Sequence, residues 1–279
     1  MKLNFSPRWI VALSVLIAVP AAADVLIVGS GQAYTTIQSA VDAADPYDTI
    51  IVLPGNYDED VNIRPNKDGL TIISTEVSSL GENTTVKAFS LLFAPTNGAD
   101  FVTIAGFKIG PGGDDNGVCI ESSGDYATFA HNHILNCNYD GIRINGGGNF
   151  DNNVHHNLIE CWSGSCNANR NAIQLEDSAS GDHNLHHNFI DGYWRNGINV
   201  GADNTLVHQN DIANATNRAI RVGGDYNFLH HNIACGSVQI ASSAAETKFQ
   251  HNDYMDPLLD QSTSTAMKKN EEITDCPFD

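Results

Sequence analysis

The chain has 279 residues, of which 33 are acidic and 14 basic, so its formal net charge is −19 at pH 7. A surface this acidic repels phosphates, which excludes the usual nucleic-acid-binding classes because those need clustered lysine and arginine. Beyond the N-terminal region, no segment approaches the roughly 20 consecutive apolar residues of a membrane helix, so a membrane-spanning protein is also excluded.

The N-terminus has the residue order of an export signal. Lys2 and Arg8 are followed by the apolar run of residues 9–19 and then by the small-residue stretch AVPAAAD. This order is typical of a secretory signal peptide. We therefore predict that residues 1–23 are the signal, with cleavage after Ala23, and that the protein is secreted or periplasmic. The sequence does not indicate its oligomeric state.

The first segment after the signal combines a helical pattern with strand-like runs. Thr35 and Gln38 have the three-residue spacing of a helix-capping box. The apolar residues that follow recur at helical spacing and would form one face, namely Ile37, Ala40, Val41 and Ala44. We predict a short amphipathic helix here.

Farther along the chain a motif of one aliphatic residue, two histidines and an asparagine recurs, as VHHNLI, LHHNFI, VHQNDI and LHHNIA. A period of 20 to 31 residues between the asparagines predicts a solenoid, in which each coil buries its apolar residues by stacking on its neighbours. Apolar residues three before and two after each asparagine would fill the interior. The asparagines are Asn132, Asn157, Asn188, Asn210, Asn232 and Asn252.

A second short strand follows in each coil, with the sequences NGVCI, DGIRI, NAIQL, NGINV and RAIRV. Apolar and polar residues alternate in these segments, as in strands with one buried face. Glycine, asparagine and aspartate supply the turns, and the coils lack a helical period, which excludes the helical solenoids.

These repeats resemble the right-handed parallel β-helix family, the fold shared by pectate lyases and many proteins with short parallel β-helix repeats. The resemblance implies an all-β, single-stranded right-handed parallel β-helix over residues 24–256, whose open end is covered by the N-terminal helix. In one coil Phe107 takes the place of the asparagine. Residues 257–279 are expected to form a C-terminal tail.

Six cysteines without a CxxC pair, in an exported chain, favour disulfides over zinc or redox chemistry. The pairs that we expect first are Cys161 with Cys166 and Cys235 with Cys276, the latter tethering the tail. Sequence alone leaves the connectivity open.

The asparagines and histidines form columns when the coils are aligned. We interpret the asparagines as structural, since their side chains can satisfy backbone groups at a corner. The histidines are interpreted as residues that repeat with the coil; the alternative is that neighbouring imidazoles share copper, zinc or nickel, in a periplasmic metal-handling protein. One histidine column contains His131, His156, His187, His231 and His251, and the other contains His155, His186, His208 and His230.

Five arginines lie in or just before the second strands, and in an acidic chain they predict a cationic strip that binds an acidic polysaccharide. Aromatic rings in the adjoining turns could stack on sugars, and they are Tyr139, Trp162, Tyr193 and Trp194. Our alignment places Cys119, Arg143, Gln174, Asn199, Arg221 and Gln239 in one outward column, with Arg170 and Arg195 at its edge. The predicted binding residues are Arg195, Arg218, Arg221, Gln174, Asn199, Tyr139 and Trp194.

The resemblance to pectate-lyase-like enzymes further implies β-elimination, in which a base removes the proton beside a uronate carboxylate while calcium or an arginine stabilises the charge. It makes Arg143 and Arg170 candidates for the base or stabilising role, and Asp140 and Glu176 candidate calcium ligands. Two alternatives remain: a non-catalytic surface or adhesion module that uses the same face, and arginines that merely neutralise nearby carboxylates while the aromatics pack in turns.

Overall fold

The structure is a computed structural model that describes residues 23–92, 98–111, 113–114, 117–145, 151–162, 170–177, 179, 181–256, 258–262 and 264–278. The predicted signal peptide, apart from Ala23, lies outside the described residues.

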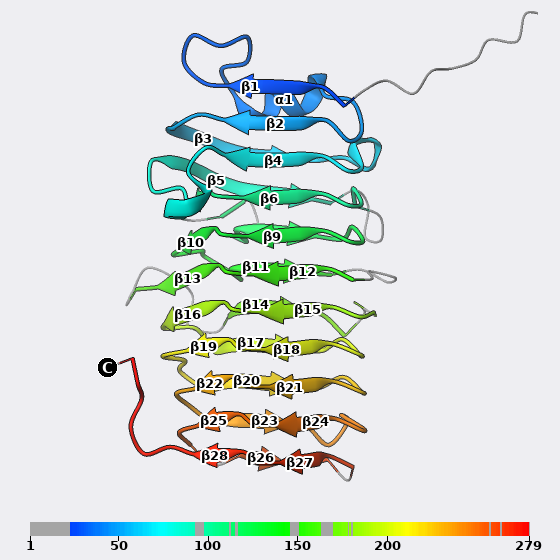
Figure 1. The fold of residues 1–279 in the computed structure, drawn as a ribbon, viewed down its shortest axis with the longest axis vertical. Coiled ribbons are helices and arrows are strands. Elements are labelled where there is room, and N and C mark those ends of the chain that lie inside the picture. Colours follow the sequence, from blue (N-terminus) through cyan, green and yellow to red (C-terminus); the bar gives the residue numbers. More distant parts are fainter. Residues whose placement is uncertain are drawn as a thin grey trace, which may run out of the picture.

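The described chain forms a stack of coils that runs from the N-terminal to the C-terminal end of the molecule (Figure 1). Each coil contributes strands to columns in which every pairing between neighbouring coils is parallel. The first strand column contains eleven strands among the described residues. They are β1 (Val25–Val28), β2 (Thr49–Val52), β4 (Thr71–Ser74), β6 (Thr103–Ala105), β9 (Thr128–Ala130), β12 (Asn153–His155), β15 (Asn184–His186), β18 (Leu206–His208), β21 (Phe228–His230), β24 (Lys248–Gln250) and β27 (Ala266–Lys268).

Two further columns belong to one sheet, because the long strand β5 pairs with strands of both. The second strand column contains β3 (Gly55–Asn62), β5 (Thr84–Leu91), β7 (Lys108–Ile109), β10 (His133–Leu135), β13 (Leu158–Cys161), β16 (Phe189–Gly192), β19 (Asp211–Ile212), β22 (Ile233–Ala234), β25 (Asp253–Tyr254) and β28 (Glu271–Glu272). The third strand column contains β8 (Ile120–Ser122), β11 (Ile142–Ile144), β14 (Asn171–Leu175), β17 (Asn196–Val200), β20 (Arg218–Val222), β23 (Val238–Ile240) and β26 (Leu259–Asp260).

Stacked aliphatic side chains fill the interior, as the repeat predicted. In the first column Leu185 lies between Val154 and Val207, and all three are buried. The third column stacks Ile173 on Ile198 in the same way. Each coil therefore depends on its neighbours for burial, and burying such a side chain stabilises the fold by roughly 1.5–3 kcal/mol.

Helix α1 (Ile37–Ala43) covers the N-terminal end of the stack (Figure 1). Its predicted apolar face is confirmed, since Ile37, Ala40 and Val41 are buried. The predicted cap is wrong by one residue, because Thr36 accepts the hydrogen bond from the Ser39 amide at 3.2 Å. Two short 3₁₀ turns, Pro65–Lys67 and Val77–Ser79, complete the described helices, and no helix in this part of the chain is long and apolar enough to cross a membrane.

The Glu59 carboxylate explains where α1 begins. It accepts hydrogen bonds from the amides of Ile37 and Gln38 at 2.7 and 3.0 Å. These amides have no partner within the helix, so a carboxylate from β3 satisfies them and also complements the helix dipole.

The asparagine column is confirmed as a continuous hydrogen-bonded ladder at one corner. The Asn188 Oδ1 accepts from the backbone amide and the Nδ2 of Asn157, at 3.1 and 3.0 Å, and its own Nδ2 donates to Asn210 Oδ1 and to the Val154 carbonyl, both at 2.9 Å. Phe107 takes the preceding place, as predicted, with its amide bonded to Asn132. The ladder thereby satisfies buried backbone groups at every turn.

The repeat continues past its predicted end. Residues expected to form a tail instead add β26, β27 and β28, and Asn270 extends the asparagine ladder by accepting from the Asn252 amide at 3.0 Å. The last coil departs from the apolar pattern at Glu272, which stands where Tyr254 does in the preceding coil, and the side chains of β27 and β28 are exposed.

The disulfide Cys235–Cys276 is confirmed, so the end of the chain is tied to the preceding coils. A second disulfide joins Cys119 and Cys137. Cys161 is also disulfide-bonded, but its predicted partner Cys166 lies outside the described residues.

Candidate functional site

The register of the third strand column places most of the predicted outward residues in line. Arg143 aligns with Gln174, Gln174 with Asn199, and Asn199 with Arg221. The continuation to Gln239 is also confirmed.

The predicted place of Cys119 in this column is wrong. Ile120 pairs with Ile142, so Glu121 stands beside Arg143. Cys119 is buried and bonded to Cys137, and this bond holds it inside the coil rather than on its outer face. The predicted alignment matched Ile120 with Ile144, whereas the structure pairs Ile120 with Ile142, and this shift of two residues puts Glu121 in the column.

A groove of about 370 Å³ opens over β14, β17 and β20 and the turns that precede them, and its lining side chains are all polar or charged apart from the ring of Tyr139. It brings together most of the predicted site residues, namely Tyr139, Asp140, Arg170, Gln174, Glu176, Arg195, Asn199, Arg218 and Arg221. Asn171, Asn196 and Asp177 complete the lining. We refer to it as the arginine groove.

Hydrogen-bonded amides form the floor of the arginine groove. Gln174 Oε1 accepts from the Nδ2 atoms of Asn171 and Asn199, at 2.6 and 2.7 Å, and Asn196 Nδ2 donates to Asn171 Oδ1 at 2.7 Å. Arg221 Nη1 donates to Asn199 Oδ1 at 3.1 Å. The network fixes the guanidinium of Arg221 on a rigid surface.

Sequence reasoning gave no role to Asn171 and Asn196, although a signal was present. Each directly follows an arginine, Arg170 or Arg195, at the start of its strand. The two asparagines align in successive coils, so the repeated Arg-Asn pair marks equivalent positions of the groove.

Arg143 is the one arginine of the five that forms an ion pair within the described chain. Its Nε and Nη2 lie 2.9 and 2.7 Å from Glu176 Oε1, and its Nη1 lies 3.7 Å from Glu121 Oε1. Burial alone would lower the pKa of the Arg143 guanidinium, but the charges of Glu176, Glu121 and Asp140 outweigh it and raise that pKa. The structure therefore shows Arg143 in the alternative role, in which it neutralises nearby carboxylates.

The other four arginines, Arg170, Arg195, Arg218 and Arg221, make no ion pair with a carboxylate among the described residues. The Arg170 guanidinium lies over the Tyr139 ring, with Cζ 3.3 Å from the ring centroid. Burial, followed by the charges of Arg221 and Arg195, lowers the pKa of Arg218. Among the described residues, the groove thus gathers four guanidinium groups that form no ion pair with a carboxylate.

Asp140 and Glu176, the two predicted calcium ligands, do not form a fitting calcium site. Asp140 is buried and accepts the Asn171 amide at 2.8 Å, while Glu176 is bonded to Arg143. Burial, opposed by that amide and by Arg143 and Arg170, raises the pKa of Asp140 to about 6. Calcium needs six to eight oxygen ligands, and the guanidinium groups around these two carboxylates repel a divalent cation.

The aromatic prediction is correct in position for Tyr139 but wrong for Trp194. The Trp194 side chain is fully buried, so it cannot stack on a sugar at the surface. Trp162 and Tyr193 are exposed, but they line a separate groove of about 520 Å³ with Glu160 and Asp191. Of the four predicted aromatic residues, Tyr139 alone lines the arginine groove.

No protein-family model and no curated protein matches the chain. Solved structures do: an alginate lyase from Paenibacillus sp. strain FPU-7 has a TM-score of 0.56 at 14% identity, over 90% of this chain and 98% of that one. The PL6-family alginate lyase AlyGC has a TM-score of 0.59 at 13% identity, over 83% and 35% of the two chains. XylC, solved with xylose, has a TM-score of 0.56 at 11% identity, over 85% and 69%. At these identities the likeness concerns the fold, and by its fold the chain is a right-handed parallel β-helix protein.

Proposed function

We propose that the arginine groove binds a linear acidic polysaccharide. The observation that carries this proposal is the presence of four arginines without carboxylate partners among the described residues of a chain whose net charge is −19. Leaving guanidinium groups together in one groove is unfavourable unless an anion joins them, and the planar guanidinium pairs well with a carboxylate.

The repeat of the fold suits a polymer. Arg170 and Arg195 occupy equivalent places, since the Arg195 amide donates to the Arg170 carbonyl at 2.6 Å, and Arg218 follows in the next coil. Neighbouring coils are about 4.8 Å apart, so the groove offers guanidinium groups on three successive coils, with Arg218 aligned on Asn196, one position away from the register of Arg170 and Arg195. A polyuronate carries a carboxylate on each sugar, and two structural neighbours are alginate lyases, which makes polyuronates the class to test first.

We further propose that the bound chain is cleaved by β-elimination. A base takes the proton from the carbon beside the carboxylate, the bond from the next carbon to the glycosidic oxygen breaks, a carbon–carbon double bond forms, and the departing oxygen takes a proton from water. Arg143 is a poor base because the Glu176 carboxylate favours its protonated form, and this ion pair leaves the charge-stabilising role to Arg170. Arg218, whose pKa is lowered, gives up its proton more readily than Arg143, and we assign its neutral form as the base.

The test is incubation with alginate and polygalacturonate while the ultraviolet absorbance of the unsaturated product is followed. Arg218→Lys should keep most of the binding, because Arg170, Arg195 and Arg221 remain in the groove, yet lose at least about 100-fold in turnover, because lysine lacks the fixed planar fork. Arg64 follows β3 in the chain and lies outside the groove, so Arg64→Lys is the matched control. It should change neither quantity. Chelation of calcium should leave turnover unchanged.

The outcomes separate the remaining possibilities. Binding without unsaturated product, with calcium present or absent, would make the protein a non-catalytic binding module. Loss of turnover on chelation would restore a calcium ion to the site. If no polyuronate binds, the arginine groove is not a polysaccharide site.

We infer that the protein acts outside the cytosol, as a secreted or periplasmic protein. The observed disulfides Cys119–Cys137 and Cys235–Cys276 support this, because disulfides persist in oxidising compartments. N-terminal sequencing of the exported protein should find Asp24 as the first residue, and recovery of uncleaved chain from the cytosol would contradict the inference.

A further inference from the structure

Two columns of histidines run side by side along the end of the first strand column, and none of these histidines lines the arginine groove. The strand-end histidines align across β12, β15, β18 and β21, and they are His155, His186, His208 and His230. The corner histidines have φ values between 52° and 55°, and they are His131, His156, His187, His231 and His251. The sharp turn at each corner brings consecutive side chains of the two columns together.

Nitrogen atoms of the paired rings face one another. The Nδ1 atoms of His155 and His156 are 2.9 Å apart, and those of His186 and His187 are 2.8 Å apart. The paired rings are nearly perpendicular, at 88° and 82°. Along each column the rings stack, with centroids 4.9 Å apart for His155 and His186 and 4.8 Å apart for His156 and His187.

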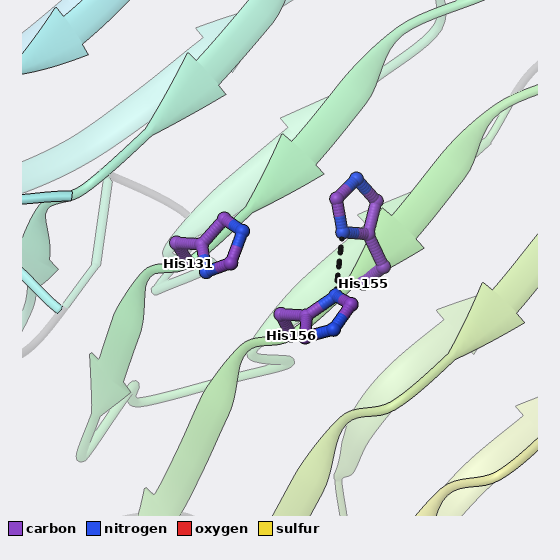
Figure 2. Close-up of side chains that lie close together, drawn as sticks. All are labelled: His131, His155 and His156. Carbon is purple, nitrogen blue, oxygen red and sulfur yellow. Dashed lines mark hydrogen bonds between the residues drawn. The ribbon is translucent and has the colours of Figure 1, made fainter. Parts of the chain in front are cut away.

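A third imidazole joins two of these pairs. Figure 2 shows His131 on the preceding coil beside the pair of His155 and His156. His156 in turn forms a second group with the pair of His186 and His187. In both groups the potential ligand atoms lie within 4.8 Å of one another, and His156 belongs to both.

The third such pair provides a comparison within the molecule. His230 and His231 have the same Nδ1 contact, at 2.8 Å, and nearly the same ring angle, at 89°. Among the described residues, however, they belong to no group of three ligands. Gln209 occupies the corner of the preceding coil, where the other pairs have a histidine neighbour.

Three of the imidazoles are disfavoured in the charged form that competes with metal binding. Burial and then the neighbouring histidines lower the pKa of His155 and of His186 to about 4, and the pKa of His156 is lowered for the same reasons. Neutral imidazole is a good ligand for copper, nickel and zinc, so on these three rings binding at neutral pH does not compete with a positive charge. The acidic chain also attracts cations through its long-range field.

Each pair brings two potential ligand nitrogens close together in the absence of metal, at the 2.8 and 2.9 Å of a hydrogen bond between the rings. With metal–nitrogen bonds of about 2.0 Å, neighbouring ligands lie about 2.8 to 3.3 Å apart, so small movements of the rings suffice to place one ion between them. Nitrogen ligands bind copper(II) more tightly than nickel(II) or zinc, so copper(II) is the ion that these groups favour.

We propose that the corner and strand-end histidines form two overlapping copper(II) sites, one made by His131, His155 and His156 and the other by His156, His186 and His187. Without metal, one ring of each pair donates its Nδ1 proton to the other. On binding, that proton moves to Nε2 of the same ring, so both Nδ1 atoms become ligands without net proton release. Because His156 serves both sites, one copper ion binds tightly per chain.

Copper(II) titration of the folded protein, followed by calorimetry and electron paramagnetic resonance, tests this proposal. We expect one ion per chain and a tetragonal spectrum with splitting from several nitrogens. His156→Gln should weaken binding at least about tenfold, since it removes the shared ligand. His231→Gln, at the equivalent corner of the two-histidine pair, should change it less than about twofold. Glutamine already occupies this corner at position 209, so both variants should fold.

Affinity order alone is uninformative, because copper exceeds zinc at most nitrogen sites. The spectrum and the paired variants therefore decide. Equal losses in His156→Gln and His231→Gln would show nonspecific binding to surface histidines, and a wild-type spectrum without nitrogen splitting would overturn the proposal. Neither result bears on polysaccharide binding, which is measured without copper.

Discussion

The asparagine corner and the arginine groove are built from the same coils, but only at the corner is the residue the same in successive coils. From Asn132 to Asn270 the corner residue is asparagine in each coil, and each bonds the next. In the third strand column the outward-facing residue differs from each coil to the next, and the aligned residues are Glu121, Arg143, Gln174, Asn199 and Arg221.

The buried backbone groups at the corner account for the difference. At the corner the side chain must satisfy backbone groups that water cannot reach, and asparagine offers a donor and an acceptor together with tolerance of tight turns. In the outward column Glu121 and Gln174 are also buried, but the side chains there bond chiefly to one another, as Asn199 does to Gln174 and Arg221 to Asn199, so different residues can stand there and serve a ligand. In this fold, strict periodicity marks structure, and a broken period on an aligned face marks chemistry.

The largest effect should come from breaking the corner. Asn188→Ala leaves the buried Asn157 amide without its partner and removes the Nδ2 hydrogen bond to the Val154 carbonyl, which should lower the free energy of unfolding by roughly 1 to 3 kcal/mol. Urea denaturation of the variant measures this change. Polysaccharide binding below the transition should be unaffected, because the corner lies on another column of the coil.

Asn214→Ala is the control for that experiment. Asn214 is exposed, and its amide bonds the Asp191 carboxylate at 2.7 Å. Its removal should change stability by less than about 0.5 kcal/mol. Equal destabilisation by the two variants would mean that burial does not explain why the corner keeps its asparagines.

A smaller, pH-dependent effect is expected at the corner where β15 begins. His183 is buried, its Nδ1 accepts the Asn152 amide at 3.4 Å, and burial lowers its pKa from 6.5 to about 4. The unfolded chain therefore takes up this proton first as the pH falls. The contribution of neutral His183 is complete above pH 6.5, is lost as the pH falls toward 4, and changes no further below that value.

His183→Asn removes this titration while keeping an acceptor, and asparagine already fills the role of acceptor at Asn152 and Asn227. The difference in melting temperature between pH 7 and about pH 5 should therefore be smaller for the variant than for the wild type. An identical acid shift in both proteins would show that His183 does not titrate in this range.

The fold could be predicted because its information is local and repeated. The spacing of Asn157, Asn188 and Asn210 gave the period, and the apolar residues around each marker gave the interior. The end of the repeat escaped prediction because Asp260 and Glu272 stand where the preceding coils have Ile240 and Tyr254. Its asparagine, Asn270, carried the remaining signal.

The sequence predicted most of the residues that line the groove, but not the contacts that each of them makes. Repeated strands placed Arg170 and Arg195 at equivalent positions, which the structure confirms. Ion pairing and burial depend on contacts between coils, so the sequence could not show that Arg143 is bonded to Glu176 or that Trp194 is fully inside. These contacts shift the proposed chemistry from Arg143 to Arg218.

The smallest effect should come from removing one cation of the groove without disturbing its floor. Glutamine occupies the outward column at Gln174 and Gln239, so Arg221→Gln should fold normally. It removes one guanidinium and should weaken polyuronate binding about three- to tenfold at low salt. Near 1 M salt, where screening acts over about 3 Å, the difference from the wild type should largely vanish.

Arg64→Gln, outside the groove, makes the same change in net charge and should leave affinity unchanged at every salt concentration. A loss that persists at high salt would mean that Arg221 acts through the amide network with Asn199 rather than through its charge. An equal loss in both variants would assign the effect to net charge and remove the arginine groove from the binding site.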